Sequence, residues 1–361
     1  MKTGKSLQEL AVELERRKNE ARDFIAPVGK LRMVADSDTD ATGEINEPAL
    51  AGLNGGTMGI ANLGHSQIQS WTKIPKVYYD RLRQEEPELL AKNVNTWFER
   101  QPETRRMVRT LDGNVRAFLS NAYRPMDNFQ LAEAVLPILS DKGCEVQSSE
   151  LTDTRMYIKA TLPSMRREIT KSSRVDDVVE AGIVISNSEV GHGSLRVEPF
   201  LLALVCINGM VASTAMRKYH VGRRADLEEE VYQLLSDKTR RLDDAALWSK
   251  VRDVVAGSFN EDIFNTLVDS AEAATEDKIT APLPQVVELT AETYRLPDKT
   301  QASILENLSR GGDFSKWGLV NAITASANTA DLYEHATELE RLGGKVLELK
   351  PSEWKVLAEA A

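Results

Sequence analysis

The chain has 361 residues, 42% of them hydrophobic, and its 45 Lys and Arg against 55 Asp and Glu give a formal net charge of -10. This composition is typical of a soluble globular protein with a sizeable core. The acidic balance excludes a uniformly basic nucleic-acid-coating protein and a polybasic membrane binder. Two cysteines are too few for a disulfide framework. With no apolar segment typical of a signal peptide or membrane span, we expect a cytoplasmic protein.

The first hundred residues predict helices around a glycine-rich segment. Apolar residues recur at helical spacing from Leu7 until Pro27 stops the pattern. Residues 36–65 are rich in Gly, Asp, Asn and Thr, which predicts a long ordered loop or a mobile arm. Helical spacing returns over residues 75–100, with a break near Pro87.

The middle of the chain, residues 104–198, predicts short strands rich in Val, Ile, Thr and Tyr. The pair Asp112-Gly113 indicates a two-residue hairpin turn. One helix interrupts the strands and begins at Asp127, which is a suitable N-cap residue. A second helix, apolar on every side, is expected over residues 199–208.

The last third is acidic and helical, with helices expected over residues 225–255, 285–295, 298–309 and 314–341. The predicted fold class is α+β, with a central antiparallel β-meander packed on helices and with N-terminal and larger C-terminal helical segments. We divide the chain into an N-terminal helical region with a Gly-rich loop, a central α+β core and an acidic helical region: residues 1–100, 101–224 and 225–361.

Positive charge is concentrated in the central region. Residues 104–224 hold 17 Lys and Arg against 13 Asp and Glu, a balance of +4, and the rest of the chain holds 28 against 42, or -14. Strand surfaces that simply carry more basic than acidic residues would give the same balance. A local basic groove for nucleic acid is the alternative interpretation.

The hairpin at Asp112-Gly113 predicts which side chains share a face. If Leu111 pairs with Asn114, Arg109 lies directly opposite Arg116. Like charges across a strand pair are unfavourable, so this arrangement favours either a bound anion or pairing of each arginine with a nearby acid. Both interpretations stay open from the sequence.

A second basic face is predicted on the strand around residue 157. Alternation places Arg155, Tyr157 and Lys159 on one face. Single-strand binders hold phosphates with basic side chains and stack bases on aromatic rings. The alternative is a half-exposed strand whose lysine reaches solvent. With further clusters along the chain, the candidate DNA-binding residues are Arg105, Arg109, Arg116, Tyr123, Arg124, Arg155, Tyr157, Lys159, Arg166, Arg167, Lys171, Arg174, Arg217, Lys218, Arg223 and Arg224.

Signals for catalysis are weak, and we assign no catalytic residue, metal or cofactor. The chain has no P-loop ending and no Gly-x-Gly-x-x-Gly after a strand, and its four histidines lack zinc-site spacing. The run from Gly191 to Gly193 fits a tight turn between strands better than an active-site turn. A nuclease site would have to come from the acids Asp176, Asp177, Glu180 and Glu189, whose spacing is not diagnostic.

Several runs resemble the domain-of-unknown-function family 932, which is carried by phages, plasmids and related mobile elements. These runs are residues 115–128 (VRAFLSNAYRPMDN), 182–191 (GIVISNSEVG), 194–200 (SLRVEPF), 204–210 (LVCINGM) and 317–324 (WGLVNAIT). The resemblance extends to a distant similarity with phage single-strand annealing proteins of the Red-beta, Erf and human RAD annealing group. That similarity implies a β-meander on a long helix, assembled into rings or filaments with DNA in a basic groove.

The preferred hypothesis is therefore a phage or mobile-element recombination protein that binds single-stranded DNA and anneals complementary strands without ATP. Its expected partners are single-stranded DNA, further copies of the chain in a ring or filament, and a host or phage replication or recombination protein. We expect no membrane partner. The alternatives are an anti-defence or regulatory protein that binds another protein and, last, a metal-dependent nuclease.

Overall fold

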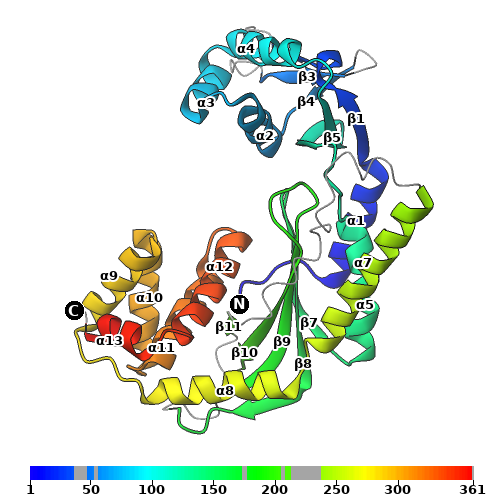
Figure 1. Ribbon diagram of the computed structural model, residues 1–361. Coiled ribbons are helices and arrows are strands. Elements are labelled where there is room, and N and C mark those ends of the chain that lie inside the picture. The colour runs from blue at the N-terminus through cyan, green and yellow to red at the C-terminus, as the bar shows by residue number, and fades with distance from the viewer. Residues whose placement is uncertain (36–46, 53–55, 173–176, 205–207, 213–236, 360–361) are drawn as a thin grey trace.

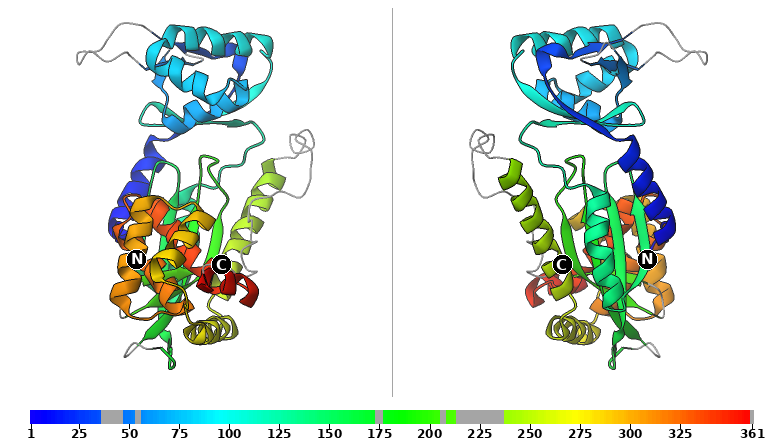
Figure 2. Two further views of the ribbon diagram at one scale, coloured as in Figure 1. Left: turned by 90° about the vertical axis from the view of Figure 1, so that its left-hand side faces the viewer. Right: turned by 90° about the vertical axis from the view of Figure 1, so that its right-hand side faces the viewer.

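The computed structural model describes residues 1–35, 47–52, 56–172, 177–204, 208–212 and 237–359. Over these ranges the fold is α+β with antiparallel sheets, as the sequence predicts. An N-terminal unit lies at one end of the molecule, beyond a curved sheet that stands between two groups of helices (Figures 1 and 2). None of the described helices is long and apolar enough to cross a bilayer.

The curved sheet has five strands that follow one another in chain order, from β7 to β11. This order confirms the predicted antiparallel meander. The strands are β7 (Glu145–Leu151), β8 (Met156–Glu168), β9 (Val178–Asn187), β10 (Arg196–Ala203) and β11 (Asn208–Val211). Every residue of β9 after the first is buried, because it is a central strand of a sheet with helices on both sides.

One face of the meander packs against helices from three parts of the chain. Ile158, Ile183 and Ile185 share an apolar core with Leu131 and Val135. The helices on this face are α1 (Leu7–Glu20), α5 (Asn128–Asp141) and α7 (Asp237–Gly257). The helix predicted to begin at Asp127 is α5, and it has Asp127 as its N-cap residue.

The C-terminal helices lie on the other side of the sheet (Figure 1). The Tyr157 ring of β8 lies 5.3 Å from the ring of Tyr333 in this group. The helices are α8 (Glu261–Glu276), α9 (Leu283–Tyr294), α10 (Asp298–Gly311), α11 (Lys316–Ser326), α12 (Tyr333–Leu347) and α13 (Pro351–Glu359). The helices expected over residues 285–295 and 298–309 are confirmed, whereas the one expected over 314–341 is two helices, α11 and α12.

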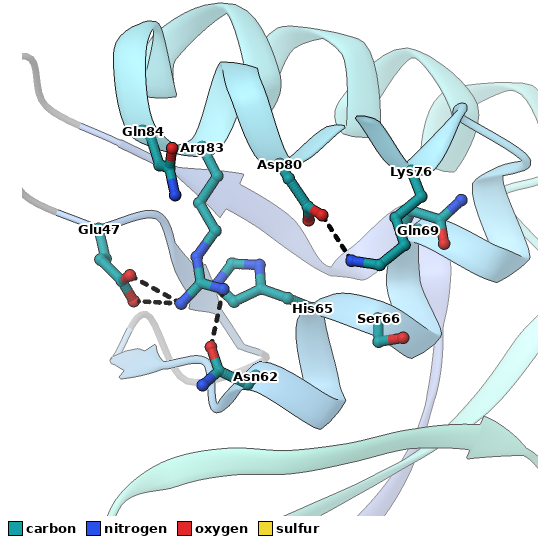
Figure 3. Close-up of a pocket in the computed structure, with 9 residues that line it drawn as sticks. All are labelled: Glu47, Asn62, His65, Ser66, Gln69, Lys76, Asp80, Arg83 and Gln84. Atoms are coloured by element: carbon teal, nitrogen blue, oxygen red, sulfur yellow. Dashed lines mark hydrogen bonds and ion pairs between the residues drawn. The ribbon is translucent and has the colours of Figure 1, made fainter. Parts of the chain in front are cut away.

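The N-terminal unit contains a three-stranded sheet in the order β1-β5-β6. Its core includes Phe98 and Phe118, which stack with ring centroids 6.0 Å apart. Its elements are β1 (Arg22–Pro27), β2 (Arg32–Val34), β3 (Ala49–Ala51), β4 (Thr57–Gly59), α2 (Asn62–Thr72), α3 (Lys76–Glu85), α4 (Pro87–Arg100), β5 (Arg105–Leu111) and β6 (Asn114–Ser120). A polar cavity lies between α2 and α3 (Figure 3).

Three local predictions are corrected. The helix expected over residues 199–208 is wrong. Residues 199–203 belong to β10, and residue 208 is the first of β11. An apolar run fits a strand buried on both faces as well as a buried helix. The first helix ends at Glu20 rather than at Pro27, since residues 22–27 pair with β5. Part of segment 36–65 forms β3, β4 and the start of α2, and its residues 36–46 and 53–55 lie outside the described ranges. The first part of the helix expected over residues 225–255, residues 225–236, also lies outside them.

The hairpin at Asp112-Gly113 is confirmed, but the register beyond it differs from the prediction. Both turn residues have positive φ, 51° and 77°, and Leu111 pairs with Asn114. A register shift after Thr110 then places Arg109 opposite Ala117. The expected direct opposition of Arg109 and Arg116 is therefore wrong.

Candidate functional site

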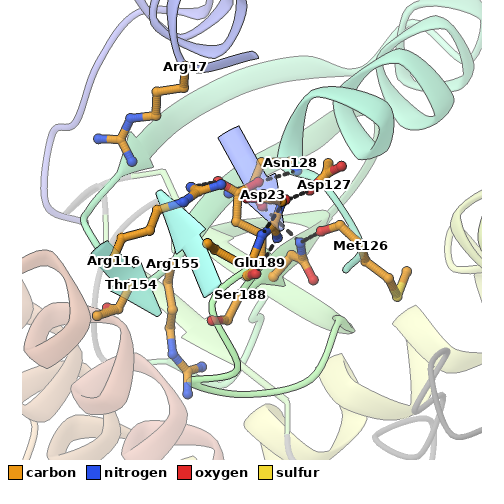
Figure 4. Close-up of polar contacts among 12 residues, drawn as sticks. Arg17, Asp23, Arg116, Met126, Asp127, Asn128, Thr154, Arg155, Ser188 and Glu189 are labelled. Atoms are coloured by element: carbon orange, nitrogen blue, oxygen red, sulfur yellow. Dashed lines mark hydrogen bonds and ion pairs between the residues drawn. The ribbon is translucent and has the colours of Figure 1, made fainter. Parts of the chain in front are cut away.

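Arg109 and Arg116 are buried beside Glu189 in a polar network between the N-terminal unit and the meander, which we call the polar junction. It consists of the buried residues Arg109, Arg116 and Glu189 and of Asp23 and Asp127, which are partly exposed. Figure 4 shows Asp23, Arg116, Asp127 and Glu189 of this group. The Arg109 side chain is 2% exposed. It donates from Nε to Asp23 at 2.8 Å and from Nη2 to Asp127 at 2.6 Å. Burial alone would lower the pKa of Arg109, but the two carboxylates raise it above its ordinary value, so the guanidinium stays charged.

Glu189 joins Arg116 to the start of α5. One of its carboxylate oxygens pairs with the Arg116 guanidinium, and the other accepts from the backbone N–H of Asn128 at 2.9 Å. Asp127 makes no side-chain cap bond, because its carboxylate is held by Arg109. The first amide of the helix is thus satisfied by a residue 61 positions away.

The polar junction is a structural connection and a poor receptor for phosphate. Its two arginines face three carboxylates, so its formal charge is -1. The sequence left two interpretations of these arginines, a bound anion or pairing with nearby acids, and the second is confirmed. The prediction that Arg109 and Arg116 form an open DNA-binding face is therefore wrong.

The predicted basic face on β8 is also closed. Lys159 is fully buried, and its Nζ lies 2.5 Å from a carboxylate oxygen of Glu340 in α12. Tyr157 is 1% exposed. Arg155 donates to the backbone carbonyl of His192 at 2.5 Å and points away from Arg116 in Figure 4. The expected open face is wrong, because α12, about 180 residues later in the chain, covers it.

The basic residues at the far end of β8 pair with acids, two of them with acids of α8. Arg166 lies 2.6 Å from Glu180, and Arg167 lies 2.6 Å from Asp269. Lys171 pairs with Glu276 at 2.8 Å. Because β9 and α8 supply these carboxylates, the three basic residues are paired within the chain and are not free to hold a DNA strand.

The remaining candidates are divided between paired residues and residues outside the described ranges. Arg124 lies 2.5 Å from Asp243 of α7, and the Tyr123 hydroxyl accepts from the backbone N–H of Gly191 at 3.1 Å. Arg174, Arg217, Lys218, Arg223 and Arg224 lie outside the described residues. Of the eleven candidates that the structure describes, only Arg105 is both exposed and without an ion pair to another described residue.

The alternative catalytic groupings are not assembled in the described parts of the chain. Asp177 precedes β9 and Glu189 follows it, and a ten-residue strand separates them by roughly 30 Å. No group of acids, histidines and cysteines suited to a metal occurs among the described residues. Gly191 and Gly193 have φ of 76° and 145°, which confirms the turn interpretation of that segment.

Arg105 belongs to a group of four exposed cations that we call the basic corner: Lys30, Arg32, Arg100 and Arg105. Two backbone hydrogen bonds, from Val28 to Thr104 and from Gly29 to Pro102, hold the two chain segments side by side. Asn95 of α4 makes two hydrogen bonds with the backbone of Met33, next to Arg32.

The basic corner is positive in an acidic chain. Residues 27–33 and 99–105 hold four cations against two acids, Glu99 and Glu103. None of the four forms an ion pair with another described residue. Arg100 also lies over the Trp97 ring, at 4.9 Å from its centroid.

The sequence pattern does not group three of these four residues with Arg105, because they are distant from it in the chain: Lys30, Arg32 and Arg100. Lys30 and Arg105 are brought together by the pairing of β1 with β5. A charge count by region assigns Lys30, Arg32 and Arg100 to the acidic remainder. A strand prediction for residues 22–27 would have been the signal needed to group them.

A family model described as a domain of unknown function (DUF932) matches residues 117–332, more than half of the chain. No curated protein matches, and no solved structure matches. The matched span contains Asp127 and Glu189 of the polar junction. The basic corner lies before it.

Proposed function

The chain belongs to the DUF932 family, a domain of unknown function, and since that description assigns no activity we propose a function from the geometry. We propose that the protein binds single-stranded DNA without ATP, promotes annealing of complementary strands, and catalyses no reaction. The phosphates are held by the basic corner rather than by the strand faces around Arg116 and Lys159.

The observation that supports this proposal is the set of four exposed cations without acidic partners among the described residues. Exposed, unpaired Lys and Arg neutralise phosphates and release counterions, which is the main source of affinity that does not depend on sequence. Four cations reach only a few phosphates. A long strand therefore requires several copies of the chain, which is why the proposal includes a ring or filament.

The test measures the affinity of the full chain for a labelled single-stranded oligonucleotide by fluorescence anisotropy over a range of salt. At about -0.7 per neutralised phosphate, four contacts give a slope of log affinity against log salt near -2.8. The double variant Lys30→Ala with Arg105→Ala is expected to halve that slope, to about -1.4. Annealing of complementary oligonucleotides without ATP is followed in parallel.

The matched control is Lys142→Ala with Lys345→Ala, which removes two exposed lysines far from the basic corner. It carries the same change in net charge, so it is expected to keep the wild-type slope. Equal loss of affinity in both double variants would reject the basic corner as the binding surface. Absence of binding by the wild-type chain at low salt would reject the function and favour the alternative of a protein-binding regulator.

A further inference from the structure

The cavity between α2 and α3 has a volume of about 380 Å³ and is lined by polar and charged residues (Figure 3). Such a volume is at the lower end of the range for sites that bind small molecules. Its charged side chains are Glu47 and Arg83 at one end and Lys76 and Asp80 at the other. The two signs balance, which disfavours a simple anion or a simple cation as the ligand.

One end of the cavity holds a carboxylate that is supplied by the chain itself. Nη2 of Arg83 donates to both carboxylate oxygens of Glu47 at 2.7 Å, and its Nη1 donates to Asn62 at 2.9 Å. The Arg83 side chain is 17% exposed and that of Glu47 is 62% exposed. The guanidinium is therefore fixed, and the carboxylate that it binds is the displaceable partner.

His65 adds a buried donor beside this guanidinium (Figure 3). The residue is 2% exposed, and its Nδ1 lies 2.9 Å from the Tyr79 hydroxyl. Burial, with a smaller contribution from Arg83, lowers the pKa of His65 to about 3, so the ring is neutral. Tyr79 donates to Nδ1, because the opposite assignment would leave the buried hydroxyl proton without an acceptor. The ring proton is then on Nε2.

Two buried donors at this end have no acceptor among the described residues. They are Nε2 of His65 and Nε of Arg83. A buried donor without an acceptor costs free energy, so a group with two acceptor oxygens would be stabilised here. A carboxylate has that geometry.

The other end of the cavity has the opposite arrangement. Nζ of Lys76 lies 2.5 Å from Asp80, and their side chains are 70% and 48% exposed. An ion pair this exposed contributes little to stability, so Lys76 is readily replaced by another cation. Each end of the cavity thus holds one cation and one carboxylate, and the more exposed member of each pair, Glu47 or Lys76, is the one that a ligand can displace.

We infer that this cavity binds a small zwitterion of the free α-amino acid class. The ligand carboxylate takes the place of Glu47 at Arg83 and accepts from His65, and the ligand ammonium takes the place of Lys76 at Asp80. The site is independent of the proposed DNA binding.

The test is isothermal titration calorimetry of the full chain with each common α-amino acid, and with acetate and methylammonium as the two half-ligands. We expect one or more amino acids to bind at one site per chain, and neither half-ligand to bind at the same concentration. Glu47→Gln removes the internal competitor and is expected to tighten binding about two- to fivefold, the range for an exposed ion pair. A purely structural Glu47–Arg83 pair would give no such gain.

Asp80→Asn is the complementary variant, and it changes a partly exposed residue that does not support the core. Loss of the ammonium acceptor is expected to weaken binding at least about tenfold. The Lys30→Ala and Arg105→Ala double variant is expected to bind the amino acid as the wild type does, so failure of the DNA proposal does not affect this test. The inference is overturned if no amino acid binds the wild type or Glu47→Gln, if acetate binds as tightly as an amino acid, or if Asp80→Asn leaves binding unchanged.

Discussion

The basic corner and the polar junction contain the same kinds of side chain in opposite environments. Arg105 is exposed and lacks an ion pair to a described residue, whereas Arg109, four positions later on β5, is buried between Asp23 and Asp127. The residues that pack against each arginine come from distant parts of the chain. Whether a cation on a strand is free to bind a ligand or is paired inside the structure depends on its long-range neighbours, which strand alternation does not reveal.

The largest effect is expected for Lys159, the most deeply buried of the residues first assigned to DNA. Lys159→Met leaves Glu340 as an unpaired charge in the interior, so the free energy of unfolding is expected to fall by about 3–5 kcal/mol. Burial lowers the pKa of Lys159 despite the opposing effect of Glu340, which indicates how costly this environment is for charge. Urea denaturation measures the loss.

The control for Lys159 is the double variant Lys159→Met with Glu340→Met. Replacing both members of a buried pair with apolar residues of similar volume is often neutral or stabilising. Recovery of most of the lost stability is therefore expected. If the double variant is as unstable as Lys159→Met, the unpaired charge is not the cause of the lost stability, and the cause is instead the side-chain packing under α12.

A smaller loss is expected at the polar junction for Glu189→Ala. This change leaves the Arg116 guanidinium and the backbone N–H of Asn128 without their acceptor. Hydrogen bonds to charged groups contribute about 1.5–3 kcal/mol, so the free energy of unfolding is expected to fall by about 2–3 kcal/mol. Thermal unfolding of Glu189→Gln, which keeps one acceptor oxygen, is expected to be intermediate. If Glu189→Ala left the free energy of unfolding unchanged, the polar junction would not be a structural connection.

Much of the fold follows from local pattern in the sequence. The hairpin at Asp112-Gly113 is specified by two residues that accept positive φ, and α5 begins after Asp127 as predicted, although the Asp127 side chain binds Arg109 and makes no cap bond. The helices α9 and α10 follow from apolar periodicity between prolines. The strand order of the meander needs only that consecutive strands pair.

The candidate site was harder to predict because its chemistry depends on long-range contacts. Alternation placed Lys159 correctly on the face opposite Ile158, but it gave no information on α12. A single extra residue in β6 changed the partner of Arg109. The basic corner requires β1, whose six residues have no strong strand signal and follow a helix directly.

A buried titratable residue of the N-terminal unit that forms no ion pair, His65, can be tested through the pH dependence of stability. The pKa of His65 falls from its ordinary 6.5 to about 3 on folding, chiefly by burial. The stability that depends on its neutral ring is present above pH 6.5 and is lost as pH falls toward 3, because the unfolded chain binds the proton first. The slope of this contribution is at most about 1.4 kcal/mol per pH unit, one proton. In urea titrations from pH 7 to 4, His65→Gln is expected to remove that slope, and an unchanged slope would contradict it.

The smallest effect on stability is expected at the basic corner, in the single variant Arg105→Ala. An exposed side chain without a partner contributes little to folding, so the free energy of unfolding is expected to change by less than about 0.5 kcal/mol. Its affinity for single-stranded DNA is expected to fall, with the salt slope reduced by about 0.7, one phosphate contact. Arg109→Ala is the matched comparison on the same strand, since it removes the same charge from the polar junction. It is expected to lower stability while the folded fraction keeps the wild-type salt slope. If Arg105→Ala proved the more destabilising, or Arg109→Ala the more damaging to the slope, the contrast between the two regions would be reversed.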